Sequence, residues 1–169
     1  MDNLELLFTR RSIRKYKEDV IPRADIEKII KAGMYAPSAR NQQPWHFIIV
    51  DNKDILYKIS HIHPYASMLP AASAAIVVCG DLSLEKSEGY WPVDCSAATQ
   101  NILLATHALR YGAVWLGVYP REKRMQDLRD LFQLPGNLQP FSLVSLGVPD
   151  EKKEDPGRYN EARIHVNKW

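Results

Sequence analysis

The stretch YAPSARNQQPWHFIIV, residues 35–50, joins the end of one predicted element to the start of another. Ala36-Pro37 favours the end of a helix, because the residue before a proline is pushed out of the helical region. The apolar run Phe47–Val50 predicts a buried strand. Between them lie side chains that can form hydrogen bonds: Ser38, Arg40, Asn41, Gln42 and Gln43. This composition indicates a surface loop that suits a polar, planar ligand.

Working outward from this stretch, apolar periodicity predicts an alternation of helices and strands. The expected helices are a short one at Leu4, Leu7 and Phe8, one over 24–35 with Ile26, Ile29, Ile30, Gly33 and Met34 on its inner face, and others over 54–60, 91–110 and 121–132. In the last of these, Met125, Leu128 and Phe132 should point inward. The expected strands are 74–80, 113–118 and 141–148. This order alone would allow a doubly wound parallel sheet.

Length and composition favour one globular domain over residues 1–169, with 150–169 as an extended C-terminal arm. The 169 residues are 46% apolar and 25% charged, and the net charge of +2 does not favour nucleic acid as a partner. No apolar run approaches the roughly 20 residues that cross a bilayer, and the start MDNLELLF is acidic rather than basic. We therefore expect no membrane contact and a cytoplasmic location.

The helix predicted over 91–110 has no charged residue between Cys95 and Leu109. Its polar members are expected to form one narrow stripe: Ser96, Thr99, Gln100 and His107. A helix that is apolar nearly all round must be covered nearly all round. It is either a central core helix or part of a subunit interface, and we favour the interface. In the arm, the alternation of Ile164 and Val166 predicts a short strand that docks on its own chain or on a partner.

Cysteine and histidine usage gives no strong signal for a metal or a disulfide. Cys79 and Cys95 lie among small apolar residues, so we interpret them as reduced core thiols. His61 and His63 have no cysteine or carboxylate cluster beside them. A surface turn before Pro64 is therefore the preferred interpretation.

The sharpest charge cluster is TRRSIRKY, residues 9–16, which contains Arg10, Arg11, Ser12, Arg14 and Lys15. Because Ile13 and Tyr16 alternate with the charges, the segment should lie extended against the body of the protein. A guanidinium group matches phosphate oxygens with two hydrogen bonds, and a serine hydroxyl adds another donor. The segment predicts a phosphate-binding site, and a solvated charged face is the alternative.

Several common nucleotide and hydrolase motifs are missing from the sequence. There is no G-x-x-x-x-G-K-[ST], no G-x-G-x-x-G after a strand and no G-x-S-x-G. What the chain offers is a phosphate site, a loop rich in amide side chains and a glycine-bearing strand end at Trp115–Val118. Together they suit flavin mononucleotide (FMN), with arginines for the phosphate, amides for the ring carbonyls and nitrogens, and backbone N–H for N5.

Five segments, in the same order across nearly the whole chain, resemble the nitroreductase family of flavin oxidoreductases in its short form: RRSIRKY, APSARNQQPWHFIIV, DCSAATQNILLATHALRYGAVWLGVYP, SLGVP and RYNEARIHVNKW. The resemblance implies non-covalent FMN at the interface of an intertwined homodimer. It implies an α+β fold of three layers, with a mixed, mostly antiparallel sheet flanked by helices and a C-terminal segment exchanged with the partner subunit. It also implies hydride transfer from NADH or NADPH.

The resemblance assigns the cofactor contacts to three regions of this sequence. At the phosphate and ribityl chain it places Arg10, Arg11, Ser12 and Arg163, and near the N1 and O2 edge of the flavin it places Arg14. Along the ring, in the other subunit, it places Pro37, Ser38, Asn41 and Gln43. Over the ring and near N5 it places Leu116, Gly117 and Val118. Ser67 and Glu161 stand where relatives carry basic residues, which bears on flavin affinity and potential.

The expected reaction takes place at the flavin, with no catalytic side chain and no metal. Arg14 and the backbone of Gly117 should tune it, because a cation near N1 favours the charge left by hydride transfer. One site would serve both the nucleotide and a planar acceptor, such as a nitroaromatic or a quinone, in a ping-pong reaction. The aromatics near the cleft would line an acceptor pocket or simply pack in the core: Trp45, Tyr65, Trp91 and Trp115.

Two alternatives stay open on the sequence. The same scaffold could support a flavin-dependent dehalogenase or an ene-reductase. The protein could instead bind or store flavin without catalysis, or act as a redox sensor.

Overall fold

The computed structural model describes residues 4–169, so the first part of the acidic N-terminal stretch, residues 1–3, lies outside the described residues. The helices are α1 (Glu5–Thr9), α2 (Arg23–Met34), α3 (Lys53–Ile62), α4 (Trp91–Ala108) and α5 (Glu122–Phe132). The strands are β1 (Trp45–Val50), β2 (Ala74–Asp81), β3 (Gly112–Gly117) and β4 (Leu138–Gly147). Each helix and strand predicted between residues 4 and 148 is present, with ends shifted by a few residues.

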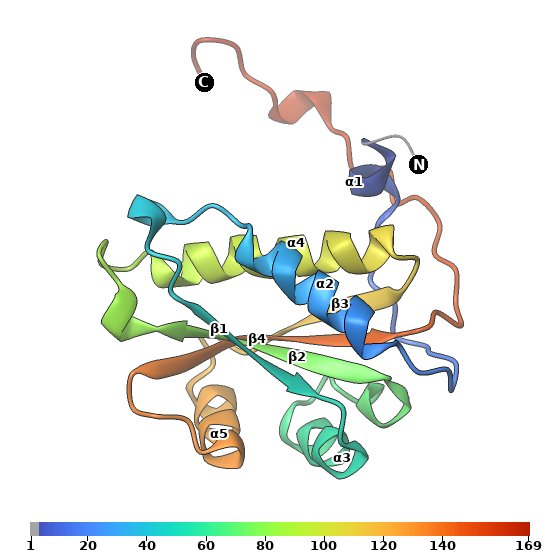
Figure 1. Ribbon diagram of the computed structural model, residues 1–169. Coiled ribbons are helices and arrows are strands. Elements are labelled where there is room, and N and C mark those ends of the chain that lie inside the picture. Colours follow the sequence, from blue (N-terminus) through green and yellow to red (C-terminus); the bar gives the residue numbers. More distant parts are fainter. Residues whose placement is uncertain (1–3) are drawn as a thin grey trace.

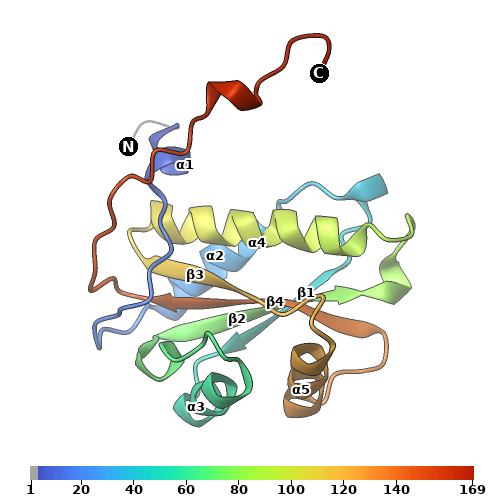
Figure 2. The ribbon, with the colours of Figure 1, turned by 180° about the vertical axis from the view of Figure 1, so that it is seen from behind.

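The strands form one sheet in the order β1-β2-β4-β3, and every neighbouring pair is antiparallel. Helices α2 and α4 cover one face of the sheet, and α3 and α5 cover the other (Figures 1 and 2). This three-layer arrangement confirms the α+β fold that the family resemblance implied. It rules out the doubly wound parallel sheet that the element order alone allowed.

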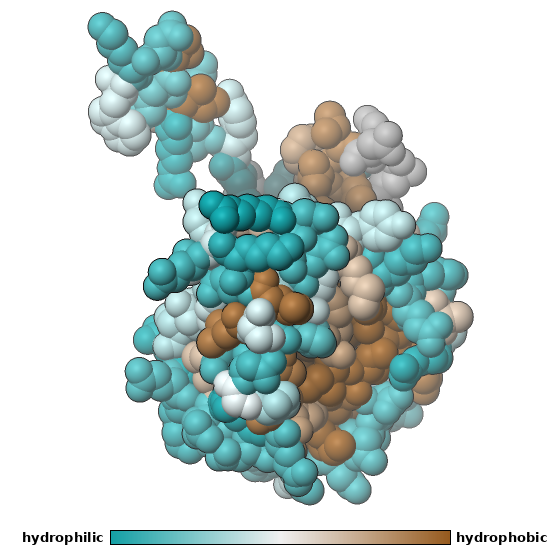
Figure 3. All heavy atoms as spheres, turned by 60° about the vertical axis from the view of Figure 1, so that its left-hand side comes forward, coloured by the Kyte–Doolittle hydropathy of each residue, from teal (hydrophilic) through white to brown (hydrophobic). Residues whose placement is uncertain are grey.

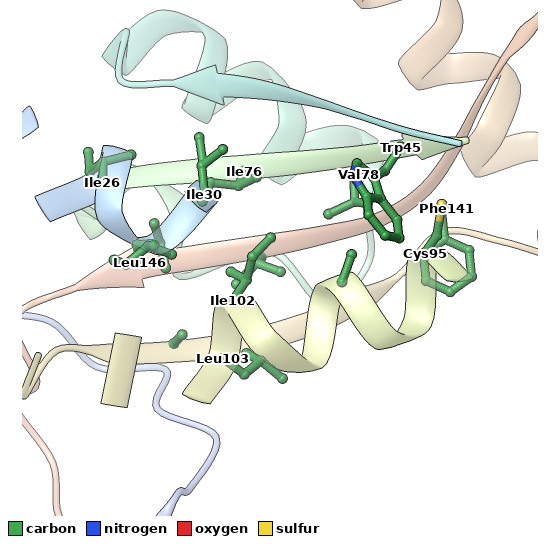
Figure 4. Packing of buried hydrophobic residues seen from close by; sticks show 14 of the residues in the cluster. Ile26, Ile30, Trp45, Ile76, Val78, Cys95, Ile102, Leu103, Phe141 and Leu146 are labelled. Atoms are coloured by element: carbon green, nitrogen blue, oxygen red, sulfur yellow. The ribbon is translucent and has the colours of Figure 1, made fainter. Parts of the chain in front are cut away.

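The two central strands are buried on both faces of the sheet. All eight residues of β2 are buried, and its side chains alternate between the two helical layers. Ile76 and Val78 point toward α2 and α4, where they meet Ile102 and Leu146 (Figure 4). Val77 points the other way, into the core beneath α3 and α5. A strand that is apolar on both sides requires a helical layer on each side, which explains the architecture.

Helix α4 lies on the sheet, and two predictions about side-chain direction were wrong. Thr99 does not join the accessible polar stripe: it is fully buried, and its hydroxyl lies 2.9 Å from that of Ser142 on β4. Met34, at the last turn of α2, is 51% exposed instead of packed inward, because α2 ends there. None of the helices within residues 4–169 is both long and apolar enough to cross a membrane.

The cationic segment, residues 10–16, is extended along the sheet, as predicted. Ser12 forms a bridge with Ala113 at the start of β3, and Tyr16 forms a bridge with Pro149 just after β4. The Tyr16 ring is buried against the α-carbon of Gly147, and its hydroxyl lies 2.5 Å from that of Ser145. Burial raises the pKa of Tyr16 to about 12, so this phenol stays protonated. Tyr16 therefore fixes the far end of the cationic segment.

The arm, residues 150–169, leaves the sheet and runs past α1, away from the body (Figures 1 and 2). The strand predicted at Ile164 and Val166 does not form within one protomer: the arm has a 3₁₀ turn at Glu161–Arg163, and both side chains are exposed. No strand of the same protomer pairs with it among the described residues. The turn is held locally, because the side chain of Asn160 accepts the N–H of Ala162 at 3.0 Å.

Both cysteines are free and buried, which confirms their interpretation as reduced core thiols. Cys79 belongs to the core beneath α3 and α5, whereas Cys95 lies on the other side of the sheet with α2 and α4. Burial raises the pKa of Cys79 to about 12, so its thiol stays protonated and unreactive at neutral pH.

We expect Gly147→Ala to destabilise the fold by about 1–3 kcal/mol, because the new methyl group would overlap the buried Tyr16 ring. Gly136→Ala is the matched control, because a methyl group there meets nothing within 4 Å. Its free energy of unfolding should stay within about 0.5 kcal/mol of wild type. Urea unfolding of both variants measures the difference. Equal stabilities would show that Tyr16 does not hold this strand end tightly.

Candidate functional site

The cationic segment lies beside the start of β3, and the predicted glycine-bearing strand end is the other end of the same strand. Ser12 pairs with Ala113 at the start of the strand, and Gly117 is its last residue. The distance along the strand from Ala113 to Gly117 is about 14 Å at ~3.4 Å per residue. Because β3 is an edge strand, no other strand of residues 4–169 pairs with this length on the side away from β4. A ligand with an anionic group at one end and a flat ring at the other could lie along it.

Arg11 is already occupied by contacts within the chain. Its Nε donates to the carbonyl of Glu154 at 2.9 Å, and one of its terminal nitrogens donates to the carbonyls of Phe8 and Arg10 at 2.6 and 3.0 Å. The other terminal nitrogen pairs with the Asp155 carboxylate at 3.3 Å. Arg11 therefore fastens the arm to the N-terminal segment, which leaves few of its donors for a ligand.

Arg10 differs from Arg11 in its contacts. Among residues 4–169 its guanidinium forms no hydrogen bond or ion pair, although it is partly buried. Burial, followed by repulsion from Arg158 and Arg11, lowers the pKa of Arg10. An anion beside it would relieve both effects. Arg158 was missed at the sequence level, because it lies in a charged, irregular stretch that has no periodic pattern.

Arg10 and Arg158 line a hollow of about 470 Å³ between α1 and the arm. Its walls are Leu7, Phe8, Arg10, Arg11, Asp155, Pro156, Gly157, Arg158 and Tyr159. Arg163, the other predicted phosphate ligand, does not line it: this residue is exposed in the 3₁₀ turn farther along the arm. In one protomer, the structure thus brings Arg10 and Arg11 together with Arg158 rather than with Arg163.

A second hollow, of about 410 Å³, lies on the other side of Arg10 and Arg11, toward the end of α4. Further cationic residues line it: Arg110, Lys152 and Lys153. His107 also faces it, with Nε2 2.9 Å from the Thr9 hydroxyl. Burial, then repulsion from Arg10 and Arg11, lowers the pKa of His107. Cationic side chains therefore lie on two sides of the cationic segment, together with the carboxylates of Glu151 and Asp155.

Ser12 is half-buried beside β3, and Arg14 is exposed farther along the same segment. The backbone N–H groups of Arg14 and Lys15 donate to one oxygen of Glu151 at 2.6 and 3.2 Å. A hydrogen bond from Lys153 lowers the pKa of Glu151, so this carboxylate stays charged and holds the segment. Arg10, Ser12 and Arg14 alternate along the extended chain, which places them on one side.

At the other end of β3, Gly117 is exposed, and a methyl group on its α-carbon would meet nothing within 4 Å. A flat ring could therefore approach the backbone. The side chains of Leu116 and Val118 are buried beneath α3 and α5, so only their backbone could meet a ligand. The N–H of Val118 already donates to the carbonyl of Phe141 at 3.3 Å, which favours Gly117 as the residue that meets N5.

His63 contacts Gly117, which corrects its interpretation as part of a surface turn. It is only 1% exposed, and its Nε2 lies 2.9 Å from the Gly117 carbonyl. The reason is helical spacing, because His63 follows the buried Leu56 and Ile59 on the inner face of α3. In residues 4–169 no group of three or more His, Cys, Asp or Glu side chains could hold a metal ion.

The polar loop before β1 is compact and conformationally strained. Arg40, Asn41 and Gln43 have φ values of 49°, 51° and 46°. Such left-handed conformations cost of order 1–3 kcal/mol each and concentrate at functional sites. Inside the loop, Ser38 accepts the N–H of Gln43 at 3.0 Å, and Asn41 accepts its side-chain amide at 2.8 Å. Pro37, Asn41 and Gln43 are exposed and Ser38 is half-buried, so the loop surface is accessible.

Two side chains brace this loop from inside: Asp94, which sequence reasoning missed, and Gln42, which it assigned to the ligand-facing surface but which is only 5% exposed. The buried carboxylate of Asp94, in the first turn of α4, accepts the Ala39 N–H at 2.9 Å and the Gln42 side-chain amide at 2.7 Å. The other end of Gln42 accepts the N–H groups of Lys86 and Ser87 at 2.7 and 3.0 Å. The sequence could have indicated that Asp94 is buried, because it lies one turn from Ala98 on the buried face of α4. It gave no such indication for Gln42.

The loop and the cationic segment lie at opposite ends of α4. Asp94 is in its first turn and His107 in its last, a separation of about 20 Å at ~1.5 Å per residue. Trp45 and Trp91, two of the predicted acceptor-pocket residues, are buried in the core. Trp115 is half-buried, and only Tyr65 is well exposed near the Gly117 end of β3.

The model of the nitroreductase family matches residues 7–63 and 63–148. A protein of Archaeoglobus fulgidus is 54% identical over 170 residues, which cover 98% of each chain. Its provisional name is NADH dehydrogenase/NAD(P)H nitroreductase. This chain belongs to the nitroreductase family.

Solved structures agree with the family. A crystal structure of a protein from Parabacteroides distasonis, which carries the same provisional name, has a TM-score of 0.94 and 42% identity and covers 98% of each chain. An FMN-dependent nitroreductase of Clostridium difficile has a TM-score of 0.86 and 30% identity, with 97% of this chain and 98% of that chain covered.

We expect Asp94→Asn to destabilise the protein by about 1–3 kcal/mol, because an amide nitrogen would face one of the two buried donors. The same substitution at Asp127, which pairs with Lys123 on the surface of α5, is the control and should cost less than about 1 kcal/mol. Urea unfolding measures both. If the two variants lose equal stability, the Asp94 brace contributes no more than a surface pair.

Proposed function

We propose that this protein is an FMN-dependent oxidoreductase that takes hydride from NADH or NADPH and reduces planar acceptors such as nitroaromatics and quinones. The observation that carries the proposal is the arrangement along β3, with the partly buried Arg10 beside one end and the open α-carbon of Gly117 at the other. Membership of the nitroreductase family and the name of the Clostridium difficile relative support it.

The residues present fit FMN. Arg10 and Arg158 repel each other and would gain from a phosphate dianion, with Ser12 as a further donor on the same segment. The open space over Gly117 would admit a flat ring against the backbone. FMN, when bound, supplies the atom that accepts hydride. Arg11 and Arg163 stay predicted phosphate ligands, with Arg11 the weaker because its donors are already engaged.

The residues of the chain would bind the flavin, orient its ring and favour the charge that it carries when reduced. Arg14, exposed beyond Ser12, would hold a positive charge near the pyrimidine edge of the ring and favour negative charge there. No acid or base is required at the ring, so one open face could receive first the nucleotide and then the acceptor. Tyr65, exposed close to the Gly117 end of β3, is the aromatic residue that we assign to the acceptor side.

A homodimer would complete this site. The loop with Ser38 and Asn41 lies about 20 Å along α4 from the cationic segment, so it would serve the flavin of the other subunit. The arm exposes Tyr159, Ile164, Val166 and Trp169, which gives it an apolar surface to bury. Apolar side chains also gather on one face of the body (Figure 3), and the hollow between α2 and edge strand β1 is lined by Ile30, Met34, Phe47 and Ile49 among others.

These surfaces suit an exchanged arm. Sedimentation velocity should therefore give twice the 19.3 kDa mass of the chain, and a strictly monomeric particle would contradict the exchange. The cytoplasmic location stays a prediction.

The purified protein is expected to be yellow or to become yellow on addition of FMN, and NADH or NADPH should bleach it without oxygen. Absorbance spectroscopy under anaerobic conditions measures both steps. A chain that takes up no FMN would end the proposal. Bound flavin that dithionite reduces but neither nucleotide reduces would favour flavin storage or redox sensing. Turnover with nitroaromatic, quinone, halogenated and enone acceptors then separates a nitroreductase from a dehalogenase or an ene-reductase.

We expect Arg10→Ala to weaken FMN binding about 10- to 100-fold, because a charge-assisted hydrogen bond to phosphate is lost. Arg11→Ala should weaken it less and should release the arm, since Arg11 contacts Glu154 and Asp155. Arg23→Ala, on the exposed side of α2, is the control. Quenching of FMN fluorescence gives the affinities, and limited proteolysis of the arm gives its release. An unchanged affinity in Arg10→Ala would remove Arg10 from the phosphate site.

A further inference from the structure

The carbonyl of Gly117 receives hydrogen bonds from two side chains of the α3–α5 layer. The first donor is His63, which directly follows α3, at 2.9 Å, and the second is Arg124, in the first turn of α5, at 2.8 Å. Arg124 also lies over the ring of Tyr65, 5.5 Å from its centroid. The last residue of β3 is thus held by two helices that are far apart in the sequence.

The protonation state of His63 follows from its contacts. Its Nδ1 accepts the backbone N–H of Tyr65 at 3.2 Å, so the ring proton of a neutral imidazole is on Nε2 and points at the Gly117 carbonyl. Burial lowers the pKa of His63, and repulsion from Arg124 adds to this, although the bond to Gly117 acts in the opposite direction. The ring therefore stays neutral at pH 7 and has one fixed tautomer. Both of its nitrogens are used in holding the local backbone.

Gly117 is a position that needs such support. A glycine has the largest conformational freedom of any residue, and this one ends an edge strand whose partner strand is β4. On the side away from β4, the N-terminal segment from residue 4 onward forms a bridge with β3 at Ala113 alone. The ladder beyond Gly117 is irregular, because the N–H groups of Val118 and Tyr119 both donate to the Phe141 carbonyl. Without side-chain donors, this peptide could tilt.

We propose that His63 is a positioning residue for flavin reduction: together with Arg124 it fixes the Gly117 carbonyl, and with it the peptide that links Gly117 to Val118, so that the open α-carbon of Gly117 presents a constant surface to the flavin ring. The inference rests on the proposed function. It gives His63 and Arg124 a role in positioning the strand end, separate from the phosphate site and the polar loop. His63 is 1% exposed, whereas Gly117 is exposed. Its effect therefore passes through the peptide and not through contact with a ligand.

The test compares His63→Phe, which removes the donor but keeps a ring, with His63→Gln, whose amide can still donate to the carbonyl. In stopped-flow reduction by NADH, His63→Phe should lower the limiting rate constant about tenfold, the effect of one lost net hydrogen bond. The apparent dissociation constant for NADH should stay unchanged. His63→Gln should recover most of the rate. His61→Phe, two residues earlier on the exposed side of α3, is the control and should behave as wild type.

Amide hydrogen exchange of the full chain without FMN provides a second readout, which does not depend on activity. His63→Phe should accelerate exchange at Gly117 and Val118 relative to Val144 in the centre of β4, whose exchange reports global stability. If wild type binds no FMN or is not reduced, the proposed function fails, while the exchange result still tests the support of the strand end.

Arg124→Met, at a half-buried site, covers the case in which His63→Phe does not fold, and should change both readouts in the same direction. The inference is overturned if folded variants of His63 or Arg124 melt at lower temperature but keep wild-type reduction rates and wild-type relative exchange at Gly117.

Discussion

The burial of β2 and β4 on both faces is the constraint on which the rest of the structure depends. Every residue of β2 is covered, and β4 is covered along most of its length, so both faces of the sheet must carry helices. The centre of the sheet is then full of side chains and cannot hold a ligand. Polar side chains that could bind one are confined to the rims. The edge of β3 and the loop before β1 are where the chain concentrates strain, charge and open backbone.

Arg10 and Arg11, the two neighbouring arginines of the cationic segment, differ in whether a carboxylate of the chain balances their charge. Arg11 is neutralised by the arm, and its contacts make it part of the framework. Arg10 keeps its charge without a partner among the described residues, beside Arg158, which is electrostatically unfavourable in the free protomer. A site that is unfavourable when empty gains more when an anion enters it. The proposed phosphate contact therefore follows from an imbalance within the chain.

The elements could be predicted from the sequence because their signals are local. The apolar run 74–80 and the helical spacing of Ile26, Ile29 and Ile30 act over a few residues. Strand order is a long-range property, and only the family resemblance gave the antiparallel sheet. The strand predicted in the arm does not form within one protomer, because alternation at Ile164 and Val166 gives a strand only where a partner strand is present. Nothing in the local sequence supplies that partner.

Prediction of the site was uneven for a similar reason. The cationic segment, the polar loop and the strand end at Gly117 are exposed, and their composition differs from that of a core. Asp94 is a polar residue on the buried face of α4, and His63 directly follows α3 in line with its buried face, so the helical spacing of the sequence indicates that both are buried. Gln42 sits between two exposed polar residues, so only the fold shows that it points inward. Arg158 became visible only when the arm was seen to run back beside α1.

The strand order also bears on how the chain is made. β3 is completed at residue 117, but its partner β4, the last strand in the sequence, spans residues 138–147 and lies between β2 and β3. During synthesis from the N-terminus, β1 and β2 can pair early, whereas β3 must wait until β4 has emerged from the ribosome. The sheet closes in one late step. A nascent chain that stalls before residue 138 would expose the unpaired edges of β2 and β3, which makes it a natural client for chaperones.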